Sequence, residues 1–194
     1  MTVPPQDGEV AARSADGGGS RPGAALAASP LHHPAGGPPP RAGEAQLFRN
    51  AILADLPAIV ALLAEDTLGE KREDPSLPLD PGYIAAFETI AANPDQRQIV
   101  AELDGKVIGT MQLTFIPGIA FKGAWRGQIE AVRVASGLRG GGIGGAMIGH
   151  AVALCRARGC RMAQLTSDKS RTRAHAFYER LGWTRSHEGF KLKL

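Results

Sequence analysis

The spacing of apolar and polar residues changes several times along the chain, and each change predicts a new element. Pro57 predicts the first turn of a helix, where its missing N–H costs little. Pro94 predicts that a later helix ends just before it, since proline disfavours helical geometry in the preceding residue. The elements expected here are a strand over residues 46–51, a helix from Asp55 to Gly69, a charged loop over residues 69–81 and a helix over residues 82–92.

Beyond Pro94 the pattern predicts strands that alternate with helices. Asp104 and Gly105 form a favoured hairpin turn, and Gly159 is a typical helix stop. The expected elements are strands over residues 98–103, 106–116, 125–134 and 161–166, a loop over 117–123, helices over 142–158 and 170–181, and a terminal strand or hairpin over 183–194. This order predicts an α/β (α+β) fold, in which helices flank both faces of a mixed central sheet.

Composition separates a terminal tail from this domain. Residues 1–44 are rich in Gly, Ala, Pro and Ser and nearly lack large apolar side chains, so they cannot bury enough surface to fold. We therefore predict a disordered tail over residues 1–44 and one domain over residues 45–194. The chain as a whole is 43% hydrophobic and 21% charged, which is a normal globular balance.

Charge and hydropathy exclude several classes of function. A net charge of +3 suits a polyanionic ligand but not a duplex binder, so we expect no nucleic-acid partner. Without an apolar run of about 18 residues or a targeting signal, we expect no membrane partner and a cytoplasmic location. Cys155 and Cys160 are expected to be reduced, with no metal site, because they lack partners at metal-ligand spacing.

A glycine-rich loop between the strand over 125–134 and the helix over 142–158 points to ligand binding. Six glycines lie between Gly137 and Gly145. Free N–H groups at a helix N-terminus bind phosphate oxygens, and glycine lets the backbone approach an anion closely. Arg139 adds a permanent charge whose donors suit a pyrophosphate. We therefore predict a phosphate-binding loop rather than a flexible hinge.

A dinucleotide-dependent oxidoreductase is an alternative interpretation of this loop. Gly140, Gly142 and Gly145 satisfy the pattern G-x-G-x-x-G, and Asp168 follows at roughly the distance of a ribose-binding acid. Two features disfavour it. Residues 135–139 separate the strand from the first motif glycine, and the chain after Asp168 is too short for the further βαβ units of that fold.

Three segments resemble motifs of the GNAT superfamily of N-acetyltransferases, in the family's order. Residues 139–144, Arg-Gly-Gly-Gly-Ile-Gly, are similar to its coenzyme A motif. Residues 128–134 resemble its fourth strand, and residues 174–183 resemble its A-x-x-F-Y-E-x-x-G-F/W signature. The resemblance covers about residues 46–194 and implies a sheet that is splayed between its fourth and fifth strands, where the co-substrate acetyl-CoA binds.

The resemblance also implies which residues bind the coenzyme. Main-chain groups of Val132 and Val134 are expected to pair with the pantetheine amides, and the loop from Arg139 to Gly145 to wrap the pyrophosphate. Arg171 stands where many members have Asn, and it could reach a phosphate instead. The expected coenzyme-binding residues are Val132, Arg133, Val134, Arg139, Gly140, Gly141, Gly142, Ile143, Gly144, Gly145 and Arg171.

Acetyl transfer requires a base, because an ammonium of pKa about 10 is mostly charged at neutral pH, and an acid for the leaving thiolate. Tyr178 is the expected acid, with an ordinary amphipathic tyrosine as the structural alternative. Glu130 is the expected base, and the alternative is that it pairs with Arg133 or Arg126 at a strand bulge. Weaker candidates for the base are His187, Glu188 and Asp168.

The sequence thus predicts an N-acetyltransferase that moves an acetyl group from acetyl-CoA to a primary amine of a small molecule, directly within a ternary complex. A non-catalytic acyl-CoA-binding sensor or interaction module is the main alternative, ahead of the oxidoreductase. A homodimer is a family-level expectation. Acceptor choice is expected to depend on the loops over residues 69–81 and 117–123, whose mixed charges do not identify the amine.

Overall fold

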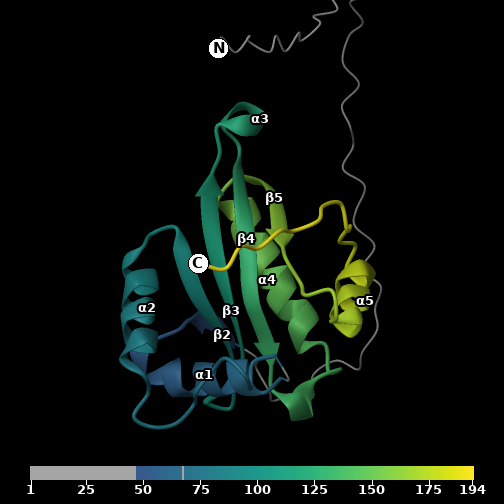
Figure 1. The fold of residues 1–194 in the computed structure, drawn as a ribbon. Helices are drawn as coiled ribbons and strands as arrows, with labels where there is room; N and C mark the ends of the chain where they lie inside the picture. Colours follow the sequence, from purple (N-terminus) through teal and green to yellow (C-terminus); the bar gives the residue numbers. More distant parts are fainter. Residues whose placement is uncertain (1–46, 67) are drawn as a thin grey trace, which may run out of the picture. The chain divides into compact units, whose positions relative to one another are not determined.

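The computed structural model describes residues 47–66 and 68–194, and the predicted tail over residues 1–44 lies outside them. The described chain forms a sheet in the order β1-β2-β3-β4-β5 (Figure 1). Neighbours from β1 to β4 are antiparallel, whereas β4 and β5 are parallel, which confirms the predicted mixed sheet. The elements are β1 (Leu47–Asn50), the 3-10 helix η1 (Leu53–Asp55), α1 (Leu56–Ala64), α2 (Pro81–Ala92), β2 (Gln96–Leu103), β3 (Lys106–Pro117), α3 (Ala120–Gly123), β4 (Trp125–Val134), the 3-10 helix η2 (Ser136–Leu138), α4 (Ile143–Ala157), β5 (Cys160–Leu165) and α5 (Thr172–Arg180).

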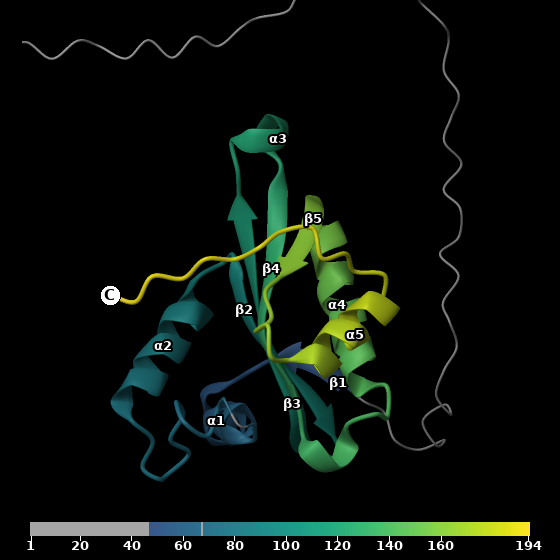
Figure 2. The ribbon, with the colours of Figure 1, turned by 45° about the vertical axis from the view of Figure 1, so that its right-hand side comes forward.

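Helices cover both faces of the sheet, as predicted. α4 and α5 lie on one face, and α1 and α2 lie on the other (Figure 2). Between the sheet and α4 is the larger core, whose fully buried members include Ile99, Met111, Leu113, Ile129 and Met147. A smaller cluster of Leu56, Val60 and Phe87 joins α1 to α2. No helix in the described part of the chain has the length and apolar character needed to cross a bilayer.

The close packing of α4 on β4 depends on a glycine in the strand. A Cβ at Gly127 would collide with the Sγ of buried Cys155 on α4. A glycine inside a strand often marks such a close approach of another element. The packing holds α4 against β4, so the loop between them must turn within the short span that η2 and the glycines occupy. Cys155 and Cys160 are both free thiols.

The first helix ends earlier than its amphipathic spacing predicted. α1 stops at Ala64 instead of continuing to Gly69. Beyond its end, Asp66 Oδ1 accepts the N–H groups of Leu68 and Gly69 at 3.0 and 2.8 Å. An aspartate that bonds to the backbone two and three residues later stabilises a turn in place of another helical turn. The turn directs the Asp66 carboxylate toward β4 and the residue before α5, where it forms ion pairs.

The predicted terminal strand or hairpin over residues 183–194 is wrong, because the segment has no regular structure. Phe190, Leu192 and Leu194 alternate with lysines as in a strand, but their exposures of 94%, 87% and 117% show that nothing covers them. Alternation produces a strand only where a neighbouring strand accepts its backbone hydrogen bonds. The segment leaves α5 and ends on the side of the sheet that carries α2 (Figures 1 and 2).

Candidate functional site

The paired sheet opens between β4 and β5. The two strands pair from Trp125 opposite Cys160 to Ile129 opposite Leu165. β4 then continues to Val134 and pairs only with β3 over this second half. Its other edge therefore presents backbone N–H and C=O groups that no described strand uses. An extended ligand with amide groups can pair with such an edge as an added strand would.

A bulge inside β4 decides which side chains share a face at this opening. Ala131 has a left-handed φ of 52°, and the register shifts between the pairs Gln112–Glu130 and Thr110–Arg133. Side chains alternate across a strand, so residues three apart normally face opposite sides. The extra residue of the bulge shifts this alternation by one position. Glu130 and Arg133 therefore lie on the same face, the one that carries α1.

The other face of this strand segment is apolar. Val132 and Val134 pack against the core that α4 covers, together with Ile143, Phe177 and Tyr178. A Cβ at Gly144 would lie 3.4 Å from Phe177 and 3.8 Å from Val134, so the start of α4, the end of β4 and α5 meet there. Val132, Val134, Ile143 and Gly144, all predicted coenzyme contacts, thus occupy one continuous region.

The glycine loop has the geometry of an anion-binding turn. Gly140 and Gly142 have φ values of 89° and 86°, in the left-handed region that favours glycine. A Cβ at either position would meet no atom within 4 Å, so conformation rather than crowding requires glycine there. Gly142 is the N-cap of α4 and no side chain caps the helix, so the first N–H groups are free to bind an anion. This turn fits a coenzyme pyrophosphate.

Arg139 is turned toward the protein rather than over the loop. Its Nε donates to Val134 O at 2.9 Å, and its Nη2 lies 3.4 Å from Glu65 Oε2. The same Glu65 oxygen accepts the Ser136 N–H at 2.9 Å. Glu65, which directly follows α1, therefore binds the Ser136 N–H and the Arg139 guanidinium at the entrance of the loop. A bound phosphate would attract the same two donors.

An ion cluster lies on the α1 side of the opening. Asp66 Oδ2 is 2.6 Å from Arg171 Nη2 and 3.1 Å from Arg133 Nε. Burial acts to raise the pKa of Asp66, but the Gly69 N–H and the two guanidinium groups lower it to about 2. The Arg133 side chain is 12% exposed, and burial lowers its pKa against the opposing effect of Asp66. The carboxylate joins residues of three segments that are far apart in the sequence.

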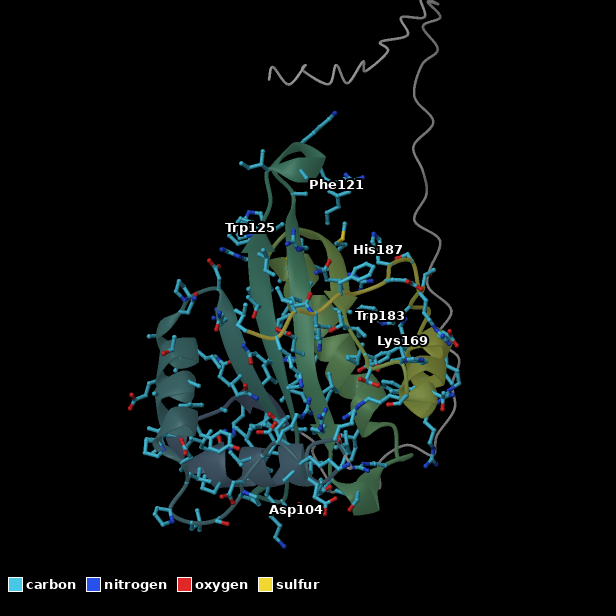
Figure 3. All side chains as sticks on the ribbon, in the orientation of Figure 1. Asp104, Phe121, Trp125, Lys169, Trp183 and His187 are labelled. Atoms are coloured by element: carbon cyan, nitrogen blue, oxygen red, sulfur yellow. The ribbon has the colours of Figure 1, made fainter. Side chains whose placement is uncertain are left out.

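Tyr178 lies next to this cluster. Its ring contacts Phe177 edge to face at 5.0 Å and lies 6.2 Å from the ring of Trp183, which Figure 3 labels beside α5. Burial raises the pKa of Tyr178, while the charges of Arg133 and Arg171 act in the opposite direction. The phenol therefore stays protonated at neutral pH. Within the described residues its hydroxyl forms no hydrogen bond, so its proton is available to a bound ligand.

The weaker candidates for the base do not join this group. Asp168 Oδ1 accepts hydrogen bonds from the N–H and hydroxyl of Ser170 at 2.9 and 2.6 Å, and these interactions lower its pKa. His187 is exposed on the C-terminal segment, with Nδ1 2.8 Å from Ser186 Oγ (Figure 3). Glu188 is exposed as well. Glu130 is exposed at the bulge, opposite Gln112, and no ion pair joins it to Arg133 or Arg126 within the described residues.

Two acidic residues at this site were not expected from the sequence. Glu65 and Asp66 fall in a stretch whose spacing predicted more helix, and nothing nearby in the sequence marks them as site residues. Only the glycine three residues after Asp66 hints at a turn. Their partners lie 67 residues (Asp66 to Arg133) to 105 residues (Asp66 to Arg171) away in the chain, so the contacts could be found only in the folded structure.

Comparisons with known proteins agree with this geometry. Residues 57–183 match the model of the acetyltransferase (GNAT) family. An aminoalkylphosphonate N-acetyltransferase of Salmonella typhimurium is 29% identical over 146 residues, which span 74% of this chain and 88% of that protein. A crystal structure described as a transcriptional regulator from Bacillus halodurans is 41% identical, with a TM-score of 0.76, over 77% of this chain and 100% of the other. The structure of a putative acetyltransferase from Agrobacterium tumefaciens is 25% identical, with a TM-score of 0.68, over 76% of this chain and 99% of the other.

Proposed function

The chain belongs to the GNAT family of acetyltransferases and is an acyltransferase that uses acetyl-CoA, and we propose that it acetylates a primary amine of a small molecule by direct transfer in a ternary complex. The observation that carries the proposal is the edge of β4 with which no described strand pairs beyond Ile129, beside an uncapped helix N-terminus. The strand edge can pair with the amides of the pantetheine arm of acetyl-CoA. The N–H groups at the helix start, which come next along the chain, can bind its pyrophosphate.

The coenzyme is proposed to lie along β4 and the loop that follows it. Main-chain groups of Val132 and Val134 pair with its amides, and the N–H groups from Gly140 to Gly145 hold its pyrophosphate. Arg139, whose side chain is 48% exposed, then leaves its contacts with Val134 O and Glu65 and turns to the phosphates. Bound in this way, the coenzyme supplies an activated acetyl group at the opening between β4 and β5.

Tyr178 is proposed to donate the proton that the leaving thiolate needs. Its partly buried ring restricts the position of the hydroxyl, and its raised pKa keeps the proton in place until negative charge develops on sulfur. An exposed phenol would be less restricted in position and open to water. Tyr178 comes from α5, which packs against the strand segment proposed to hold the coenzyme.

Glu130 is proposed to accept the proton of the acceptor ammonium, directly or through water. The bulge at Ala131 aims it at the α1 face, opposite the apolar face of Val132 and Val134. The acceptor therefore approaches from the α1 side, and the coenzyme occupies the strand edge and the α4 side. Transfer within such a ternary complex needs no acyl-enzyme. Cys155 is no competing nucleophile, because burial raises the pKa of its thiol to about 11.

The experiment measures binding and turnover in the same preparations. Acetyl-CoA should raise the melting temperature of the full chain, and thiol release should depend on an added primary amine. Tyr178→Phe should lower kcat about 100-fold and leave coenzyme affinity within about twofold. Tyr83→Phe is the matched control, because Tyr83 lies on α2, where its hydroxyl binds Glu73 at 3.1 Å.

Two outcomes would contradict the proposal. If acetyl-CoA binds but no amine produces thiol, the acyl-CoA sensor is the better account. If acetyl-CoA does not bind at all, the proposal fails at its first step. The oxidoreductase alternative conflicts with the family match. A cytoplasmic location and a homodimer stay predictions.

A further inference from the structure

The ion cluster beside Tyr178 has more positive than negative charge. Two guanidinium groups, those of Arg133 and Arg171, share the single carboxylate of Asp66. Arg72 lies close enough to Arg133 to act on it as a third positive charge. Charges that are removed from water require partners, and one carboxylate cannot neutralise two guanidinium groups. The cluster is therefore incomplete as an ion network.

The hydrogen bonds of Arg133 are incomplete as well. Its Nε is buried and lies 3.1 Å from Asp66 Oδ2, but no acceptor lies in line with the N–H bond. Its Nη1 donates to the carbonyl of Val132 at 2.9 Å. A buried polar group without a partner destabilises the fold unless a ligand or water satisfies it. Because the Nε atom itself is buried, a ligand would reach this guanidinium through its remaining Nη donors, which suit an anionic or strongly polar acceptor.

The position of the cluster shows from which side such a partner arrives. Arg133 shares the α1 face with Glu130 because of the bulge at Ala131. The free N–H groups of the glycine loop are at the start of α4. The cluster is therefore beside the proposed base and acid, on the face of β4 opposite the one where Val132 and Val134 pack.

We propose that Arg133 and Arg171, which the family resemblance led us to expect at the coenzyme, bind instead an anionic group of the acceptor, a phosphonate, phosphate or carboxylate carried by the same small molecule as the amine. This inference rests on the proposed function and names its substrate class. Guanidinium groups bind such oxyanions through strong charge-assisted hydrogen bonds, and a single guanidinium fork can donate two in parallel. With the anion held there, the amine at the other end of a short acceptor reaches toward Glu130. Asp66 holds both guanidinium groups in position for this purpose.

The first test compares acceptors and uses the unmodified full chain. The acceptors are 2-aminoethylphosphonate and its dimethyl ester, then β-alanine and β-alaninamide. Each pair keeps the amine and removes the negative charge. We expect kcat/KM to be about 10- to 100-fold higher for the charged member, the ratio typical of a charge-assisted contact. Equal values for both members would overturn the inference while leaving the acetyltransferase intact.

The second test asks whether the anion belongs to the acceptor or to the coenzyme. Arg171→Gln should lower the preference for the charged acceptor about tenfold and change the Kd of coenzyme A less than twofold. Arg173→Gln, an exposed change in the first turn of α5, the helix that follows Arg171, is the control and should leave both values unchanged. A weaker coenzyme Kd with an unchanged acceptor preference would assign the arginines to a coenzyme phosphate and overturn the inference.

A third readout does not depend on turnover. Methylphosphonate should raise the melting temperature of the unmodified protein, and Arg171→Gln should abolish the increase. In steady-state assays it should compete with the amine and not with acetyl-CoA. Competition with acetyl-CoA instead would overturn the inference. If methylphosphonate binds as expected and no amine is acetylated, the proposed function fails and the anion site stands.

Discussion

The two sides of the β4–β5 opening are built from different chemistry. On the α4 side, the proposed coenzyme site is mainly backbone: a strand edge with which no described strand pairs, left-handed glycines and the uncapped start of a helix, to which Arg139 adds one charged side chain. On the α1 side, the proposed acceptor site consists of side chains: Glu130, Arg133, Asp66 and Arg171. The backbone of the coenzyme site can recognise a ligand that never changes. The side chains of the acceptor site can change its specificity through single substitutions that leave the backbone in place.

The two proposed sites also differ in how far apart their residues are in the sequence. The glycine loop is one continuous stretch that joins β4 to α4. The acceptor cluster joins the end of α1, the middle of the bulged strand and the residue before α5, with 105 residues between Asp66 and Arg171. Variants on the two sides should therefore fall into two classes, those that change coenzyme binding and those that change acceptor preference.

The largest effect expected on ligand binding tests the coenzyme side. Arg139→Ala should raise the Kd of acetyl-CoA about 10- to 100-fold, because it removes a charged donor to phosphate. The preference among acceptors should not change. Isothermal titration with the full chain measures the first value and competition between two acceptors measures the second. Arg156→Ala, an exposed change at the opposite end of α4, should match the unmodified protein. Unchanged coenzyme affinity would remove the pyrophosphate from this loop.

The next effect tests the acceptor side. Glu130→Gln should lower the rate about tenfold at neutral pH, and the deficit should shrink above about pH 9, where an amine of pKa about 10 loses its proton unaided. The measurement is a pH profile of kcat/KM at saturating acetyl-CoA. Glu188→Gln, an exposed change on the C-terminal segment, is the control. A deficit that is the same at every pH would show that Glu130 is not the base.

A stability measurement tests whether conformation alone requires glycine in the loop. Gly142→Ala should lower the free energy of unfolding by about 1 to 2 kcal/mol, because its φ of 86° is unfavourable for a residue with a Cβ. Gly137→Ala is the matched control: its Cβ also meets no atom within 4 Å, but its φ is not left-handed. Urea midpoints compare the two. Equal losses would show that φ does not explain the requirement.

The smallest effect depends on pH and involves Asp66. Its folded-state pKa of about 2 lies below its ordinary value of 3.8, so its ion pairs stabilise the fold above about pH 4 and are lost as the pH falls toward 2. Asp66→Asn should therefore have a lower melting temperature than the unmodified protein at pH values above that range, with the difference closing on acidification. A difference that is independent of pH would show that the carboxylate charge is not what stabilises this turn.

Most of the fold could be predicted from the sequence because its signals are local. The Asp104–Gly105 turn has φ values of 50° and 74°, as a two-residue hairpin requires, and β4 covers the residues that its pattern indicated. Two predictions failed where local signals were overridden. Asp66 ends a helix that its spacing would have continued, and the alternating residues near Phe190 find no neighbouring strand.

The same division applies to the site. Glycines that require a left-handed φ and a helix that begins after a strand are consequences of neighbouring residues, so the amino-acid order was enough to predict an anion-binding loop there. The bulge that puts Glu130 and Arg133 on one face, and the carboxylate that joins Arg133 to Arg171, depend on which strands pair and where α1 packs. Charges attract across space rather than along the chain, so only the tertiary structure could bring these residues together.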